Sequence, residues 1–224
     1  MEPEARTESW LTAEPVVERV PLGSGSWVDV VRALVQDGDR VHDELVATVE
    51  WEQGKVFRYE RWVDEPRLSA YQSTHAAHPA LQEVQAWISA RYHARFDGVS
   101  LAHYRDERDS VAWHRDRELR YLDDTVIGVL SLGARRHWLL RPLTDRRADD
   151  DDVTGVLDAN LGSGDLLVMG GGAQAELLHA VPKARGRVGS RVSAQWRYTS
   201  GKGRRDNNPS YYAPRHYGPG GKSR

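Results

Sequence analysis

The chain has 224 residues, with 31 basic and 33 acidic side chains and a formal net charge of −2 at pH 7. Hydrophobic residues make up 39% of it, including eight tryptophans and nine tyrosines, which is typical of a folded domain and excludes a disordered chain. There is no cysteine, so disulfides, cysteine nucleophiles and thiolate metal sites are excluded, and His, Asp or Glu must hold any metal. A nucleic-acid partner would have to contact a local basic surface, because the whole chain is not basic.

No apolar stretch is long enough to cross a membrane. The longest, residues 126–132 and 166–169, fall far short of the roughly 20 residues that a spanning helix needs. The acidic start MEPEARTE lacks the basic and then apolar pattern of a secretory signal. We therefore expect a cytoplasmic protein with no membrane association, and a monomer.

The first part of the chain predicts an arm followed by helices. Residues 1–26 contain prolines and a Gly-Ser stretch without a sustained period, which predicts an extended N-terminal arm. Apolar residues at three- and four-residue spacing predict a helix over 27–35, and a second short helix is expected over 45–51. Residues 56–63 have the β-branched and aromatic content of a strand, and Pro79 begins a helical pattern that continues to Tyr92.

From about residue 98 the pattern changes to short β-rich runs separated by Gly, Asp and Pro. These runs are residues 99–104, 125–132, 136–142, 165–170 and 190–198. Short strands with such punctuation indicate an antiparallel sandwich or barrel, not a parallel α/β sheet. We expect one mainly β domain over residues 27–200, in which the helix over 79–92 packs on a sheet.

The last segment, residues 201–224, is a basic tail. It combines six Lys or Arg with one Asp and three Tyr. Two interpretations remain open from composition: a flexible solubilising end, or a segment that contacts phosphates through its charges and stacks its aromatic rings on bases.

Two histidines and one aspartate form a candidate metal site. His114 and Asp116 follow a predicted strand, and residues i and i+2 of a strand point to the same side, so both can reach one point. His179 lies beside a later apolar strand. Two histidines and one carboxylate on one face of a metal form the facial arrangement of non-haem iron(II) sites. By itself, an HxD pair is also compatible with a histidine hydrogen-bonded at the edge of the core.

Arg191 and Arg197 are six residues apart in a strand-like run, so they point to the same side. If that side is buried, two guanidinium groups call for anionic partners, which a dicarboxylate co-substrate would supply. If both arginines face solvent, the alternating Val192, Ala194 and Trp196 form the buried face.

Several segments together resemble the AlkB family of 2-oxoglutarate and Fe(II)-dependent dioxygenases. They are FDGVSLAHYRDERDSVAWHRDRE, VIGVLSLGARRHWLLRP, GDLLVMGGGAQAELLHAVPK and RVSAQWR, preceded by EPRLSAYQS. They occur in order over roughly residues 55–199. The resemblance implies a double-stranded β-helix, or jelly roll, with N-terminal helices packed on one sheet. It also implies oxidative dealkylation of bases in DNA or RNA, with a nucleotide-recognition segment at about residues 55–75.

The resemblance also implies roles for the metal and co-substrate residues. His114, Asp116 and His179 match the ligands of Fe(II), at which O2 reacts. Arg191 and Tyr104 match the residues that bind the distal carboxylate of 2-oxoglutarate. The remaining matched residue, Arg197, corresponds to an arginine near the metal-side carboxylate and the ligand aspartate.

On the substrate side, Glu118 matches an acidic residue that contacts the exocyclic amine of the base. Arg67, Tyr71 and Gln72 lie in the nucleotide-recognition motif, where Tyr71 and Gln72 replace the usual aromatic pair.

Two more positions, Ala102 and Leu177, also depart from the family pattern. Three alternatives therefore stay open: a dioxygenase of the same fold acting on tRNA, protein or a small metabolite, a nucleic-acid binder without turnover, and a cupin-like protein without iron.

Overall fold

A computed structural model of the chain describes residues 9–58, 60–116, 119–143, 157–206 and 215–217. Strands are the main regular structure and form two antiparallel sheets, so the predicted mainly β, antiparallel class is confirmed. The helices in this part of the chain are α1 (Gly38–Thr48), α2 (Pro79–Tyr92) and the short α3 (Ala173–Glu176). None of them is long and apolar enough to cross a membrane.

The large sheet contains nine strands, and every neighbouring pair is antiparallel. In sheet order they are β1 (Glu18–Gly23), β2 (Ser26–Val31), β10 (Leu166–Gly171), β7 (Thr125–Gly133), β12 (Arg191–Thr199), β5 (Gly98–Tyr104), β4 (Arg61–Ser73), β3 (Glu52–Arg58) and β13 (Arg215–Tyr217). The small sheet has the order β6 (Val111–His114), β11 (Leu177–Val181), β8 (Leu139–Pro142) and β9 (Leu157–Asp158).

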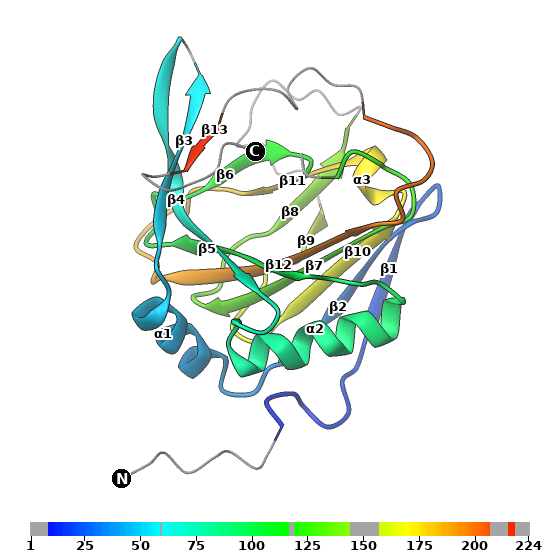
Figure 1. Ribbon diagram of the computed structural model, residues 1–224, viewed down its shortest axis with the longest axis horizontal. Helices are drawn as coiled ribbons and strands as arrows, with labels where there is room; N and C mark the ends of the chain where they lie inside the picture. Colours follow the sequence, from blue (N-terminus) through cyan, green and yellow to red (C-terminus); the bar gives the residue numbers. More distant parts are fainter. Residues whose placement is uncertain (1–8, 59, 117–118, 144–156, 207–214, 218–224) are drawn as a thin grey trace.

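The large sheet lies between the two long helices and the small sheet (Figure 1). Its helix side packs into one core, in which Ile88 of α2 and Leu45 of α1 meet Leu101 and Trp196. Its other side packs into a second core against the small sheet, with Trp138 among the buried residues. Because both faces of its central strands are covered, β7 is an almost continuous buried run instead of an alternating one.

Close approach of α2 to the sheet requires a glycine in β7. A Cβ atom on Gly128 would lie 2.9 Å from Cδ1 of Ile88. On the neighbouring strand β12, Trp196 is paired with Gly128, and its indole donates a hydrogen bond to the buried Gln85 Oε1 at 3.1 Å. The helix predicted to begin at Pro79 is confirmed, and its packing positions the strands that carry the site.

Three predictions of local structure within the domain differ from the structure. Residues 26–31 form strand β2 instead of a helix, because valines dominate the segment and pairing with β1 and β10 satisfies its backbone. The helix expected over 45–51 is α1, which begins earlier and ends at Thr48. The single strand expected over 56–63 is a hairpin of β3 and β4 whose turn places Glu60 at φ 59° without any glycine to mark it.

The ends of the chain also differ from the prediction. Residues 18–23 are not an extended arm but strand β1, and Trp10 is buried in the helix-side core. In the tail, residues 215–217 form the short strand β13 on the outer edge of β3. The residues of the tail at 207–214 and 218–224 lie outside the described part of the chain.

The helix-side core predicts a clear contrast in stability. Ile88→Ala should lower the free energy of unfolding by about 2 to 5 kcal/mol, because Ile88 is fully buried and truncation leaves a cavity. Val16→Ala should change it by less than about 0.5 kcal/mol, because that side chain is 73% exposed. Urea denaturation measures both; equal values would contradict the packing of α2 on the sheet.

Candidate functional site

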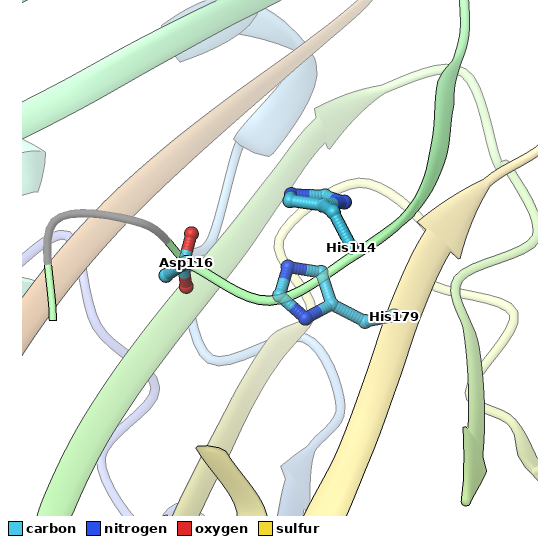
Figure 2. A group of neighbouring side chains, drawn as sticks. All are labelled: His114, Asp116 and His179. Carbon is cyan, nitrogen blue, oxygen red and sulfur yellow. The ribbon is translucent and has the colours of Figure 1, made fainter. Parts of the chain in front are cut away.

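Two histidines face each other across a strand pair of the small sheet. His179 of β11 lies opposite His114 of β6, and their ring centroids are 4.2 Å apart. Asp116 follows two residues after β6 ends and turns back toward the two rings (Figure 2). One ligand atom from each of the three side chains lies within 4.8 Å of the others. The structure thus brings together the three residues that the sequence predicted to hold a metal.

Both histidines are held in the form that binds metals. Nδ1 of His114 lies 2.8 Å from the Ala112 carbonyl oxygen, which can only accept, so Nδ1 carries the proton and Nε2 keeps its lone pair. Burial lowers the pKa of His114, and burial together with the neighbouring His114 lowers the pKa of His179 to about 3. Neutral imidazoles at physiological pH are metal ligands.

Asp116 is a buried carboxylate, and one of its two oxygens makes no hydrogen bond to the described residues. Burial by itself would raise its pKa, but Arg197 and the two histidines together hold that pKa well below its ordinary value. Oδ1 lies 2.9 Å from Nε of Arg197. Its other oxygen, Oδ2, is buried without a hydrogen-bond partner among the described residues. The Gln174 side chain donates to the Asp116 carbonyl oxygen at 2.6 Å and so fixes the backbone that presents this carboxylate.

Arg191 and Tyr104 form a second buried pair. They are cross-strand partners on β12 and β5, and the Arg191 guanidinium carbon lies 5.3 Å from the centre of the Tyr104 ring. Arg191 is completely buried, and its Nε donates to Ser131 Oγ at 2.8 Å. Within the described residues, Nη1 and Nη2 make no hydrogen bond. Burial lowers the pKa of Arg191 to about 10, so the group stays charged at neutral pH and requires an anionic partner.

A cavity connects the histidine–aspartate group with Tyr104. Six of the side chains that line it were predicted from the sequence to be functional: Arg67, Tyr104, His114, Asp116, His179 and Arg197. Residues that the sequence analysis missed also line it, among them Trp138, Ser193 and Gln195. Ser193 and Gln195 share the face of Arg191 by strand alternation, so that spacing could have identified them. The Trp138 ring stacks on the His179 ring with centroids 5.4 Å apart.

Two predicted substrate residues do not line this cavity, and the position of a third is not described. Tyr71 is 54% exposed on β4, and Gln72 is paired with Val99, whose side chain belongs to the helix-side core. Strand alternation therefore turns Gln72 to the face opposite the cavity. The third, Glu118, lies outside the described residues.

A family profile described as the 2OG-Fe(II) oxygenase superfamily matches residues 21–205. The chain belongs to this superfamily. Human alpha-ketoglutarate-dependent dioxygenase alkB homolog 3 is 31% identical over 182 residues, which cover 75% of this chain and 61% of the human protein. DNA oxidative demethylase ALKBH2 of Arabidopsis thaliana is 29% identical over 122 residues, covering 46% of this chain and 38% of the plant protein. The resemblance to AlkB proteins is thereby confirmed.

The chain spans between 57% and 61% of the length of the alkB homolog 3 proteins that it matches. Among solved structures, OsALKBH1 has a TM-score of 0.54 at 14% identity, covering 81% of this chain and 100% of that chain. A prolyl hydroxylase from Trichoplax adhaerens has a TM-score of 0.54 at 12% identity, covering 76% and 83%. These two structures share the fold.

The cofactors of the superfamily, Fe(II) and 2-oxoglutarate with O2, are those that the sequence predicted. The residues present fit them. Two neutral imidazoles and a carboxylate with a spare oxygen are a donor set for Fe(II). The buried guanidinium of Arg191, with two terminal nitrogens that make no hydrogen bond to described residues, fits a carboxylate in bidentate geometry.

The geometry predicts that metal binding depends on all three side chains of the group. His114→Ala, Asp116→Ala or His179→Ala should weaken Mn(II) binding at least tenfold, because each removes one of three protein donors. Calorimetric titration under anaerobic conditions measures this. His137→Ala is the matched control, since His137 is exposed and pairs with Asp158. Unchanged affinity in any of the three variants would contradict the assignment.

Proposed function

We propose that this chain is a 2-oxoglutarate and Fe(II)-dependent dioxygenase that removes N-alkyl groups from bases in DNA or RNA. The observation that carries the proposal is a three-donor group that lines one cavity with Tyr104, together with the buried guanidinium of Arg191 beside that tyrosine. AlkB-type relatives named as dioxygenases and DNA oxidative demethylases support the substrate class. The reaction would yield succinate, CO2 and formaldehyde.

Three side chains would hold the iron, and their neighbours would orient them. His114, Asp116 and His179 each offer one donor atom to the same point. Hydrogen bonding to Ala112 fixes the His114 ring, and the ion pair with Arg197 fixes the Asp116 carboxylate. When bound, Fe(II), 2-oxoglutarate and O2 supply oxidative decarboxylation of the 2-oxo acid coupled to hydroxylation of the alkyl carbon.

Arg191 and Tyr104 would bind the distal carboxylate of 2-oxoglutarate. A planar guanidinium offers two parallel N–H donors, and the adjacent phenol adds a third hydrogen bond. Apolar side chains from both sheets, including Ile127 and Trp138, line the same cavity. They would exclude water, which strengthens the electrostatic interactions within it.

The β3–β4 hairpin supports a nucleic-acid substrate. Phe57 and Trp62 pack edge to face near its turn, with ring centroids 5.6 Å apart, and are 45% and 48% exposed. Exposed aromatic rings are platforms on which unpaired bases stack. On the same hairpin, Arg67 of β4 lines the cavity, and strand β13 of the basic tail pairs with β3. This hairpin would therefore act as the nucleotide-recognition segment.

The arrangement of the two sheets fits the same family. The two facing sheets would be the double-stranded β-helix that the family resemblance implies, with α1 and α2 supporting the larger one. Antiparallel pairing throughout both sheets and the continuous core between them support this.

A second candidate function is hydroxylation of tRNA, a protein side chain or a small metabolite by the same site. The specific observation in its favour is that Tyr71 and Gln72 do not line the cavity, so Arg67 alone of the predicted base contacts does so within the described residues.

Arg191 gives the most specific prediction for the co-substrate. Arg191→Ala should weaken 2-oxoglutarate binding by about tenfold or more, because a charge-assisted hydrogen bond contributes roughly 1.5 to 3 kcal/mol. Arg191→Lys should recover little of it, because an ammonium group does not offer two parallel donors. Calorimetric titration of 2-oxoglutarate into the Mn(II)-loaded protein measures both, and wild-type affinity in Arg191→Ala would remove this arginine from the site.

The substrate class is tested by product analysis. The anaerobically loaded protein should release formaldehyde and succinate in equal amounts when air and oligonucleotides carrying 1-methyladenine or 3-methylcytosine are added. Unmethylated oligonucleotides are the control. Succinate formation without formaldehyde across the panel would instead favour the second candidate function.

A further inference from the structure

A chain of hydrogen bonds lies on the helix side of the large sheet, behind Arg191 and Tyr104; its two histidines, His42 and His103, are buried, and its outer end, Asp43, is exposed. Tyr104 is the last residue of β5 and Arg191 is the first residue of β12, so each lies where a strand ends. Successive residues of a strand point to opposite faces. The residues just before them, His103 and Ser190, therefore turn away from the cavity and toward α1.

There side chains of α1 meet His103 of β5 and Ser190, the residue before β12. Asp43 Oδ1 lies 2.8 Å from His42 Nδ1, and His42 Nε2 lies 3.0 Å from Ser190 Oγ. The same hydroxyl oxygen lies 2.6 Å from His103 Nε2. One serine thus joins a helix residue to a residue of β5.

The chemistry of the groups sets the direction of each hydrogen bond. Asp43 can only accept, so His42 donates from Nδ1 and keeps a lone pair on Nε2. Ser190 donates its hydroxyl proton to that lone pair and accepts from Nε2 of His103. Burial, and after it the neighbouring His42, lowers the pKa of His103, so this ring is neutral and carries the single proton that the arrangement needs.

Neighbouring residues hold these hydrogen-bonded side chains in place. The Trp51 ring lies 5.0 Å from the His103 ring. Gly133 of β7 has φ 80°, and a Cβ atom there would lie 2.6 Å from both the His42 ring and the Ser190 carbonyl oxygen. That carbonyl accepts a hydrogen bond from the Ala134 backbone at 2.9 Å. Both the backbone and the side chain of Ser190 are therefore fixed one residue before Arg191.

We propose that the hydrogen-bonded chain Asp43–His42–Ser190–His103 positions Arg191 and Tyr104 and thereby sets the affinity for 2-oxoglutarate. His42, Ser190 and His103 are positioning residues, because they act through their chain neighbours from the opposite face of the sheet. This inference rests on the proposed function of Arg191 and Tyr104. It adds that α1, far from the metal group in sequence and on the other side of the sheet, contributes to co-substrate recognition.

The test is titration of 2-oxoglutarate into the Mn(II)-loaded full-length protein under anaerobic conditions. Ser190→Ala removes the hydroxyl that joins the two histidines and should raise the dissociation constant about three- to tenfold, as expected for a lost hydrogen bond. Ser190→Thr keeps a hydroxyl and should restore affinity to near the wild-type value. The Mn(II) affinity itself should be the same in all three proteins, because the metal group lies on the other face.

Gln85→Met is the matched control. Gln85 accepts a buried hydrogen bond from Trp196 of the same strand β12, on the same face of the sheet but nearer its other end. Its replacement should lower the melting temperature while leaving the 2-oxoglutarate affinity unchanged. Should Ser190→Ala not fold, His42→Gln tests the same link from α1 and should weaken binding in the same direction.

The outcomes separate this inference from the function on which it rests. Weak binding by Arg191→Ala together with wild-type binding by Ser190→Ala, or by His42→Gln in its place, would overturn the positioning role alone. An equal loss of affinity in Gln85→Met would also overturn it, since general destabilisation would then explain the effect. Wild-type binding by Arg191→Ala would overturn the proposed co-substrate site and the inference with it.

Discussion

The ion pair between Asp116 and Arg197 joins the two halves of the site. Asp116 belongs to the segment that follows β6 of the small sheet, whereas Arg197 belongs to β12 of the large sheet. Both groups lie in the layer between the sheets, where an unpaired charge would be costly. Because the same strand also carries Arg191, this contact sets where the metal group lies relative to the co-substrate pair.

Strand β12 therefore performs a different task on each face. Arg191, Ser193, Gln195 and Arg197 alternate along the face toward the cavity, while the residues between them pack against the helices. A shift of one residue in its pairing with β5 and β7 would exchange the two faces and turn the polar side chains of β12 away from the cavity. The packing of α1 and α2 fixes this register, since Trp196 is fully buried beneath α2.

The residues of the metal and co-substrate site could be predicted from the sequence more accurately than the secondary structure around them. The common side of Arg191 and Arg197 follows from strand alternation, which needs no knowledge of the fold. The same argument predicted that Asp116 would lie beside His114, and the structure brings them together although strand β6 ends at His114. By contrast, β2 was predicted to be a helix, because a strand buried on both faces has no alternation and its apolar residues happen to match a helical period. Gln72 was misplaced for a related reason: a motif match gives a position along β4 but not the face to which it points.

A crystal structure grown anaerobically with Mn(II) and 2-oxoglutarate tests the central claim most directly. We expect one anomalous scattering peak in contact with His114, Asp116 Oδ2 and His179, with the distal carboxylate of 2-oxoglutarate on Arg191 and Tyr104. A metal bound elsewhere, or 2-oxoglutarate away from Arg191, would contradict it.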